Sequence, residues 1–145
     1  MFSQKADYAL RAMFDLAQCA GGGRCVRTAE IARRERIPEK FLELILVELR
    51  KAGLVKSQRG PEGGHRLARD ASRITVGEIW RAMDGPLSSV LGADRAEGAE
   101  RPSASCFHSV WKEVEKAVGQ VVDHVTLADL CARAEARRRV VDFSI

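Results

Sequence analysis

The stretch from Thr28 to Leu67 constrains this chain most, because two apolar stripes of helical spacing precede a glycine-rich turn within forty residues. Thr28 can cap a first short helix that buries Ile31 and Ala32. Ile37 fills the turn that follows, and Pro38 can open a second helix, because its missing N–H costs nothing in the first helical turn. The second helix has apolar residues at a 3–4 spacing that buries one stripe: Phe41, Leu42, Ile45, Leu46 and Leu49.

A hairpin follows the second helix. Gly53 stands where a left-handed C-terminal cap would end the helix. Leu54–Ser57 and His65–Leu67 then read as two short strands around the Gly/Pro turn Arg59–Gly64. Two helices joined by a tight turn and followed by a hairpin predict a winged helix-turn-helix.

This arrangement favours DNA as a partner. A helix with a polar, exposed first turn can enter a major groove, where base edges are distinguishable, and Glu39, Lys40 and Glu43 lie on that turn. Arg59 lies at the tip of the hairpin, where a guanidinium can reach a narrow minor groove and Gly60 lets the backbone come close. The DNA-binding residues predicted from this pattern are Thr28, Pro38, Glu39, Lys40, Glu43, Arg59 and Gly60.

The distribution of charge agrees with this reading. The net charge is +4, but residues 1–74 hold 15 Lys and Arg against 9 Asp and Glu, whereas residues 75–145 hold 9 against 11. The positive surplus therefore falls on the predicted DNA reader, as phosphate binding favours. No apolar run approaches the roughly 20 residues that a membrane span needs. We expect a soluble cytoplasmic protein that makes no membrane contact.

No pattern in the chain points to an enzyme. Its four cysteines, Cys19, Cys25, Cys106 and Cys131, form neither a C-x-x-C pair nor a zinc-finger spacing, so we expect free thiols. The glycine-rich turn lacks the Gly-Lys-Ser/Thr ending of a phosphate loop and joins two strands.

The flanking segments predict further helices. A first helix runs from a Ser3 cap to about Gln18, and it is apolar over more than half its circumference, so it needs a second neighbour besides the winged domain; a partner subunit is the natural one. Val26 can form a short edge strand beside the wing. Thr75 and Glu78 form a capping box for a later helix.

A long helix near the C-terminus carries the prediction of a dimer. From Phe107 its apolar residues recur at spacings of 4-3-4-3-4, which is the seam of a coiled coil. A lone seam can also pack on its own domain, but a domain this small already has enough helices for its core. The predicted dimer contacts are Phe107, Trp111, Val114, Val118, Val121 and Val125.

These motifs together resemble the Rrf2 family of transcriptional regulators, the group of the iron–sulfur cluster regulator and the cysteine metabolism repressor. The resemblance covers nearly the whole chain and recurs in order: KADYALRAMFDLA at Lys5–Ala17, EIARRERIPEKFLELILV at Glu30–Val47, LRKAGLVKSQRGPEGGHRLA at Leu49–Ala68, ITVGEIWRAMDGP at Ile74–Pro86 and CFHSVWKEVEKAV at Cys106–Val118. It implies a winged helix-turn-helix that binds DNA. His65 stands where the family often has tyrosine, so the resemblance leaves open a phosphate or sugar contact and plain strand packing.

The resemblance also raises the question of a cofactor. The family's cluster-binding members hold an iron–sulfur centre with three cysteines in the loop before the long helix, and only Cys106 matches one of them. His108 and Asp7, which matches a position that supplies a carboxylate ligand across the dimer in nitric-oxide-sensing members, complete a poor set of ligands, because clusters prefer thiolates. We therefore expect no firm metal site and disfavour a cluster. Cys106 is either a buried, inert thiol or a reactive one at a helix N-terminus.

The sequence thus predicts a mainly α fold with a small β-hairpin wing and a long C-terminal dimerisation helix. Residues 1–86 form the DNA-binding domain, 87–105 a flexible loop at the family's cluster-loop position, and 106–145 the dimerisation and C-terminal helices. The predicted function is that of a homodimeric repressor acting on a palindromic operator in double-stranded DNA. The alternatives are a cluster sensor with unusual ligands and a winged module that binds protein instead of DNA.

Overall fold

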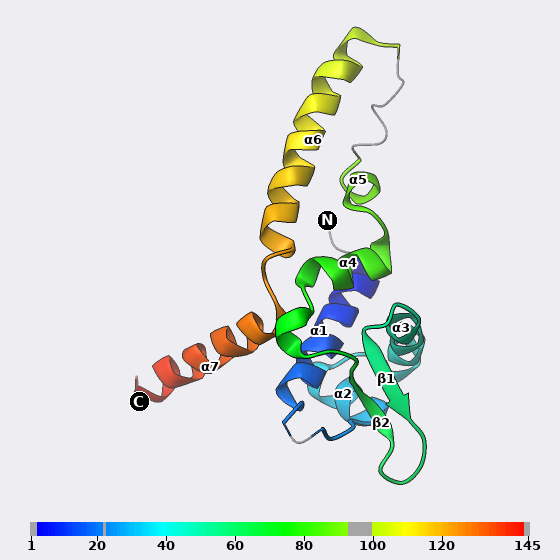
Figure 1. Cartoon of the computed structure of the whole chain (residues 1–145), viewed down its shortest axis with the longest axis vertical. Helices are drawn as coiled ribbons and strands as arrows, with labels where there is room; N and C mark the ends of the chain where they lie inside the picture. The colour runs from blue at the N-terminus through cyan, green and yellow to red at the C-terminus, as the bar shows by residue number, and fades with distance from the viewer. Residues whose placement is uncertain (1–2, 22, 93–99, 144–145) are drawn as a thin grey trace.

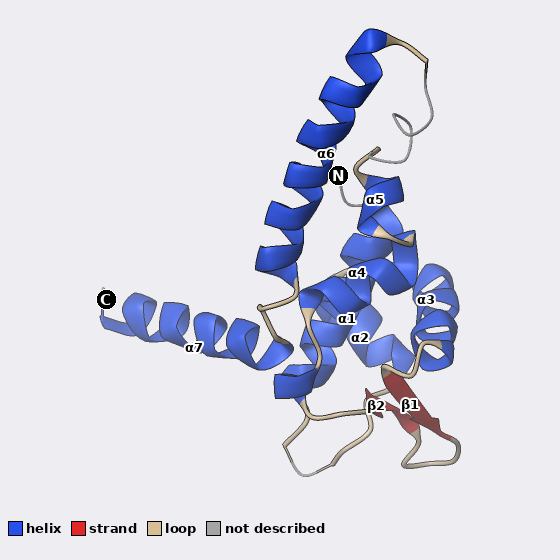
Figure 2. Cartoon of the chain, turned by 45° about the horizontal axis from the view of Figure 1, so that its top comes forward, coloured by secondary structure: helices blue, strands red, loops and turns tan. Residues whose placement is uncertain are grey.

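The computed structural model describes residues 3–21, 23–92 and 100–143. The fold is mainly helical with one antiparallel hairpin, as predicted, and its layout is shown in Figures 1 and 2. The elements are α1 (Gln4–Gln18), α2 (Thr28–Glu35), α3 (Glu39–Lys51), β1 (Val55–Gln58), β2 (Gly64–Leu67), the 3-10 turn η1 (Ala71–Arg73), α4 (Val76–Asp84), α5 (Leu87–Val90), α6 (Pro102–Val122) and α7 (Leu127–Phe143).

Helix α1 lies at the centre of the body. The Ser3 hydroxyl accepts a hydrogen bond from the amide of Ala6 and caps the helix as predicted. The small residues Ala6, Ala9 and Ala12 are fully buried, so neighbouring elements approach the helix closely. Those neighbours are α2, α3, α4, α7 and β2. Helices α4 and α7 of the same chain cover much of α1, and the predicted contact of α1 with a partner subunit stays a prediction.

An ion pair fixes α1 against α2. The guanidinium of Arg34 donates to both carboxylate oxygens of Asp15, with distances of 2.8 Å from Nε and 2.9 Å from Nη2. Asp15 is buried, and its hydrogen bonds are the main cause that raises the pKa of Arg34. Two parallel hydrogen bonds hold a planar guanidinium in a single orientation, so the pair also fixes the position of α2 along α1.

The helix-turn-helix forms largely as predicted. Ile31 and Ile37 are buried, and Arg36 takes a left-handed conformation in the turn between α2 and α3. Two details differ. Thr28 is the first residue of α2 and not its cap, which is Arg27, and Pro38 caps α3 instead of lying inside its first turn.

The prediction that Phe41 is buried is also wrong, since its side chain is 60% exposed. The stripe Leu42, Ile45, Leu46 and Leu49 already covers the inner face of α3. Phe41 therefore points outward and is available for contacts with another molecule.

The hairpin begins and ends close to the predicted positions. The strands β1 and β2 pair with Val55 opposite Leu67, Lys56 opposite Arg66 and Ser57 opposite His65. Val26 forms a bridge to His65, which confirms the predicted edge segment: each amide donates to the other's carbonyl, at 2.8 and 2.7 Å. Gly64 allows this, because a Cβ there would lie 2.5 Å from the carbonyl oxygen of Val26.

The C-terminal helices are attached to α4. Thr75 and Glu78 form the predicted capping box at the start of α4. Thr75 also bridges to Thr126 at the junction of α6 and α7. The guanidinium of Arg81 donates two hydrogen bonds to Asp123, at 2.5 and 2.8 Å. The C-terminal end of α6 is thus pinned to the body, while the rest of the helix rises away from it (Figure 1).

The bounds of the long helix differ from the prediction. It begins at Pro102, five residues before Phe107, and ends at Val122, so Val125 lies beyond it. Pro102 fits the first helical position, where its missing N–H leaves nothing unbonded. In the predicted loop 87–105, residues 87–90 form α5, whereas 93–99 lie outside the described residues. None of the helices in the described parts of the chain is long and apolar enough to cross a membrane.

The Asp15–Arg34 pair gives a prediction for stability. Asp15→Asn should lower the free energy of unfolding by roughly 1–3 kcal/mol, because Arg34 loses its charged partner at a buried site. Arg34 itself is partly exposed, and water there keeps the loss below that of a fully buried pair. Urea unfolding followed by circular dichroism measures the effect.

Asp7→Asn is the matched control. Asp7 pairs with Arg11 at 3.2 Å across one helical turn, and the Asp7 carboxylate is exposed, unlike that of Asp15. Its loss should stay below about 0.5 kcal/mol. Equal losses in the two variants would contradict a special role for the buried pair.

Candidate nucleic-acid interface

An open groove of about 450 Å³ lies between the N-terminal ends of α2 and α3 and the hairpin. Six of the predicted DNA-binding residues line it, namely Thr28, Glu39, Glu43, Arg59, Gly60 and His65. The other two, Pro38 and Lys40, are exposed at the start of α3 but do not line the groove. The fold therefore brings residues as far apart in the sequence as Thr28 and His65 to one surface.

The first turn of α3 supplies acidic and basic groups at this surface. Glu39 and Glu43 line the groove, and Lys40 is exposed beside them. Carboxylates repel phosphates but can accept a hydrogen bond from the amino group of cytosine. The turn can therefore select bases more readily than it can add affinity.

The tip of the wing presents Arg59. Its side chain is exposed, and no hydrogen bond or ion pair holds it to another described part of the chain. Gly60 has a φ of +106°, which favours glycine at that position. The turn thus exposes the guanidinium of Arg59, and its neighbour Gly60 has no Cβ that would keep another molecule away from the backbone.

Arg27 anchors the tip, a role that the sequence reasoning missed. Its Nη2 donates to the carbonyl oxygen of Gly60 at 3.4 Å and also to that of Pro61. Because Arg27 is the cap residue of α2, it ties the wing tip to the helix-turn-helix. An arginine directly before a predicted helix cap was the only signal in the sequence.

His65 joins the wing to α2. Its Nε2 lies 2.9 Å from the hydroxyl of Thr28, and its Nδ1 lies 2.8 Å from that of Ser57. Burial lowers the pKa of His65, and the positive charge of Arg50 lowers it further. The neutral ring is therefore favoured, with one nitrogen donating and the other accepting. Because both nitrogens are engaged within the chain, Thr28 and His65 hold the groove in shape.

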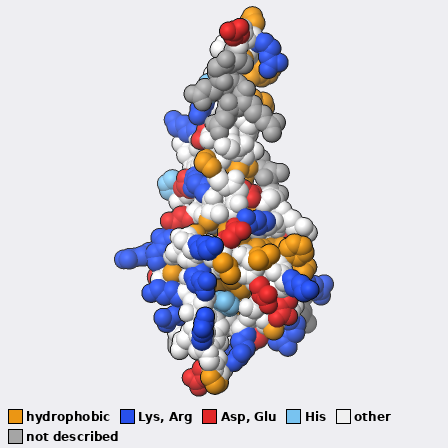
Figure 3. Space-filling model, turned by 90° about the vertical axis from the view of Figure 1, so that its right-hand side faces the viewer, with side chains coloured by type: hydrophobic (Ala, Val, Ile, Leu, Met, Phe, Trp, Pro, Cys, Tyr) orange, Lys and Arg blue, Asp and Glu red, His pale blue; other side chains and the backbone are white. Residues whose placement is uncertain are grey.

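Exposed apolar side chains on α3 form another feature that the sequence reasoning missed. Phe41 is 60% exposed and Leu44 is 65% exposed, one turn apart. The face of the molecule that carries α3 shows hydrophobic side chains next to acidic and basic ones (Figure 3). The signal was present, because the stripe from Leu42 to Leu49 is complete without Phe41.

Within a single chain, the described residues form no cluster site around Cys106. Cys106 lies in the second turn of α6, not before the helix, and it is exposed, which argues against the first of its two predicted alternatives, a buried and inert thiol. Asp7 pairs with Arg11. Across residues 3–21, 23–92 and 100–143, no three His, Cys, Asp or Glu side chains gather closely enough to hold a metal ion. One thiol, with His108 as a neighbour, does not fit an iron–sulfur cluster.

The predicted dimer seam lies on the surface of α6. Phe107 is 56% exposed, Trp111 38% and Val121 61%, while Val114 and Val118 are half-buried. Val110 is exposed beside them. Such a row of large apolar side chains is unusual on a surface that stays in water.

The geometry defines a winged helix-turn-helix protein with a groove suited to DNA. Comparisons with known proteins agree. The sequence model of the Rrf2 family, described as an iron-dependent transcriptional regulator, matches residues 2–133. The HTH-type transcriptional regulator CymR of Bacillus subtilis is 35% identical over 143 residues, which cover 99% of this chain and 98% of CymR.

Solved structures show the same fold. The structure of CymR, the global cysteine regulator of B. subtilis, matches with a TM-score of 0.77 at 35% identity and covers 92% of this chain and 97% of that chain. The structure of T. potens IscR matches with a TM-score of 0.77 at 39% identity, over 94% of this chain and 90% of that chain. The chain belongs to the Rrf2 family of transcriptional regulators and is not an enzyme.

His65 gives a prediction for the pH dependence of stability. Its folded pKa lies below the unfolded value of about 6.5, so the unfolded chain binds the proton first as the pH falls. The stability from His65 is present above about pH 6.5 and is lost as the pH falls toward the folded pKa. Thermal unfolding between pH 7.5 and 5.5 should therefore show a smaller drop in Tm for His65→Gln than for the wild type.

His124→Gln serves as the control, because His124 is exposed just after the end of α6 and does not line the groove. This variant should follow the wild-type pH profile. Identical profiles for His65→Gln and the wild type would show that the ring does not titrate in this range.

Proposed function

We propose that this protein is a homodimeric, sequence-specific DNA-binding repressor of the cytoplasm. The groove that joins α3 to the wing carries the proposal, because it gathers six residues predicted from the sequence to meet DNA. A base-reading helix and a cationic hairpin tip on one surface match the two grooves that a DNA duplex presents. Membership in a family of transcriptional regulators supports the same function.

Helix α3 enters the major groove in this proposal. Glu39 and Lys40 contact base edges or the adjacent phosphates, and Glu43 selects by rejecting bases that offer it no donor. Phe41 adds an apolar surface on the same turn, which suits the methyl group of thymine. Arg59 enters the neighbouring minor groove, where the potential is most negative.

The dimer forms through α6. The exposed seam from Phe107 to Val121 packs against the same seam of a second copy, since a symmetric pair buries both rows at once. Two copies of α3 then address half-sites about 34–36 Å apart on a roughly palindromic operator. A redox change, a metal ion or a small molecule regulates DNA binding.

The two alternatives have less support in the structure. An iron–sulfur sensor needs several thiolates, and the sequence from Gly92 to Arg101 has none, which leaves Cys106 alone. A wing that binds protein would favour an apolar tip, whereas this tip presents Arg59 and Gly60.

Arg59→Ala tests the minor-groove contact. An operator is first selected from a random pool of duplexes with the wild-type protein. The variant should then lose roughly 1–3 kcal/mol of affinity for it in a fluorescence anisotropy titration at fixed salt. Arg138→Ala, on the exposed helix α7, is the matched control and should bind as the wild type does. Unchanged affinity for Arg59→Ala would exclude the contact.

Trp111→Glu tests the dimer. A carboxylate in the middle of the seam would be buried without a partner, so the variant should sediment as a monomer at micromolar concentration and lose most operator affinity. Lys116→Glu also places a carboxylate on α6, outside the seam, and should remain a dimer. A dimer with Trp111→Glu would place the interface elsewhere.

A further inference from the structure

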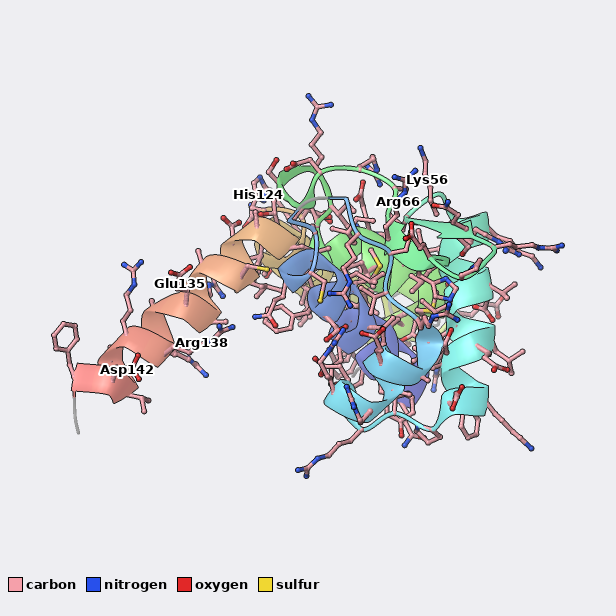
Figure 4. The ribbon with its side chains drawn as sticks, turned by 90° about the horizontal axis from the view of Figure 1, so that it is seen from below. Lys56, Arg66, His124, Glu135, Arg138 and Asp142 are labelled. Atoms are coloured by element: carbon pink, nitrogen blue, oxygen red, sulfur yellow. The ribbon has the colours of Figure 1, made fainter. Side chains whose placement is uncertain are left out.

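The wing carries two cations directly opposite each other. Lys56 on β1 pairs in register with Arg66 on β2, and both side chains are exposed. They extend from the same part of the hairpin when the molecule is seen from below (Figure 4). Like charges that face each other across two strands destabilise a hairpin slightly, so a bound anion would stabilise this arrangement.

In the described parts of the chain, no carboxylate forms an ion pair with either of these two cations. Neither Lys56 nor Arg66 forms a hydrogen bond or an ion pair with the residues that the structure describes. The nearby cations Arg24 and Arg69 are different, because they lie 3.8 Å from Glu30 and 3.2 Å from Glu78. We call Lys56 and Arg66 the outer wing pair.

The outer wing pair faces away from the groove. Side chains alternate along a strand, so Lys56 and Arg66 point to the side opposite Ser57 and His65. Because His65 contacts Thr28 on α2, the side of the hairpin that carries Lys56 and Arg66 faces outward. A separate polar hollow of about 400 Å³ lies there, lined by Lys56 and Arg66 together with Arg24, Arg69 and one carboxylate, Asp70, which accepts hydrogen bonds from Ser72.

We propose that the outer wing pair binds phosphates of the DNA backbone that flank each half-site. The proposal rests on the proposed function, since Arg59 at the tip of the same hairpin leads the wing into the minor groove. One side of the hairpin faces α3, so its other side meets the DNA backbone beyond the half-site. Lys and Arg suit phosphates, whereas the core of a protein–protein interface is poor in charged residues.

Trimmed and extended duplexes test this inference. The probe is the duplex selected by the wild-type protein, prepared either as the two half-sites alone or with six further base pairs at each end. The wild type should bind the extended duplex on the order of 10-fold more tightly at moderate salt. The double variant Lys56→Gln/Arg66→Gln should bind both lengths about equally.

The salt dependence gives a second readout. Each phosphate contact contributes about 0.9 to the slope of log affinity against log salt concentration. A dimer has four such side chains, so the double variant should lower the slope on the extended duplex by about 2–4. The swapped variant Lys56→Arg/Arg66→Lys should keep both the gain from flanking DNA and the slope.

A matched control removes one Lys and one Arg elsewhere. Lys116→Gln/Arg138→Gln makes the same change in net charge on α6 and α7, and Arg138 lies far from the wing (Figure 4). It should behave as the wild type does. Equal loss in both double variants would overturn the inference, because it would reflect net charge alone.

The remaining outcomes separate the two proposals. A wild-type protein that selects no duplex would refute the proposed function. A wild type that binds the selected duplex, with a double variant that keeps the flanking gain and the slope, would refute only the outer wing pair as a phosphate site. Thermal unfolding of the double variant should show a Tm no lower than that of the wild type, which excludes misfolding as the cause of a loss.

Discussion

The close packing around α1 determines where the two DNA-reading elements lie. Ala6, Ala9 and Ala12 present almost no side chain, so α2, α3, α4 and β2 share one helix as their support. The recognition helix and the wing are therefore positioned by the same rigid element. The Asp15–Arg34 pair then fixes α2 along α1, because the two hydrogen bonds of a planar guanidinium allow one register.

Selectivity and affinity fall on different parts of the proposed interface. Glu39 and Glu43 at the start of α3 would lie against base edges, where a carboxylate costs affinity but rejects wrong partners. Arg59 and the outer wing pair would restore this affinity through contacts to the DNA backbone, which carry little sequence information. His65 ties the wing to α2, since it bonds to Thr28 on α2 and to Ser57 on β1.

Local signals in the sequence were sufficient for the fold. Ser3 and the Thr75–Glu78 capping box mark helix starts through hydrogen bonds with near neighbours, and the structure confirms both. The predictions for single residues were wrong where contacts between distant parts of the chain decide how a side chain lies. The hydroxyl of Thr28 bonds to His65 instead of capping α2, and Phe41 fits the helical spacing of the core but lies outside it. Lys56 and Arg66 became a pair only once the hairpin register was known.

The attachment of α6 explains how a dimer contact could act on the reading surface. Arg81 and Asp123 join α4 to the end of α6, and a hydrogen bond to Asp123 from that guanidinium is the main cause that lowers the pKa of the carboxyl. Gly77 lets the two elements meet, because a Cβ there would lie 2.1 Å from a carboxylate oxygen of Asp123. The bridge between Thr75 and Thr126 adds a backbone link at the same place. Since α4 packs directly on α1, a change in how two α6 helices pair would reach α3 through three contacting helices. The spacing between the two recognition helices of the proposed dimer therefore depends on this junction as much as on the seam itself.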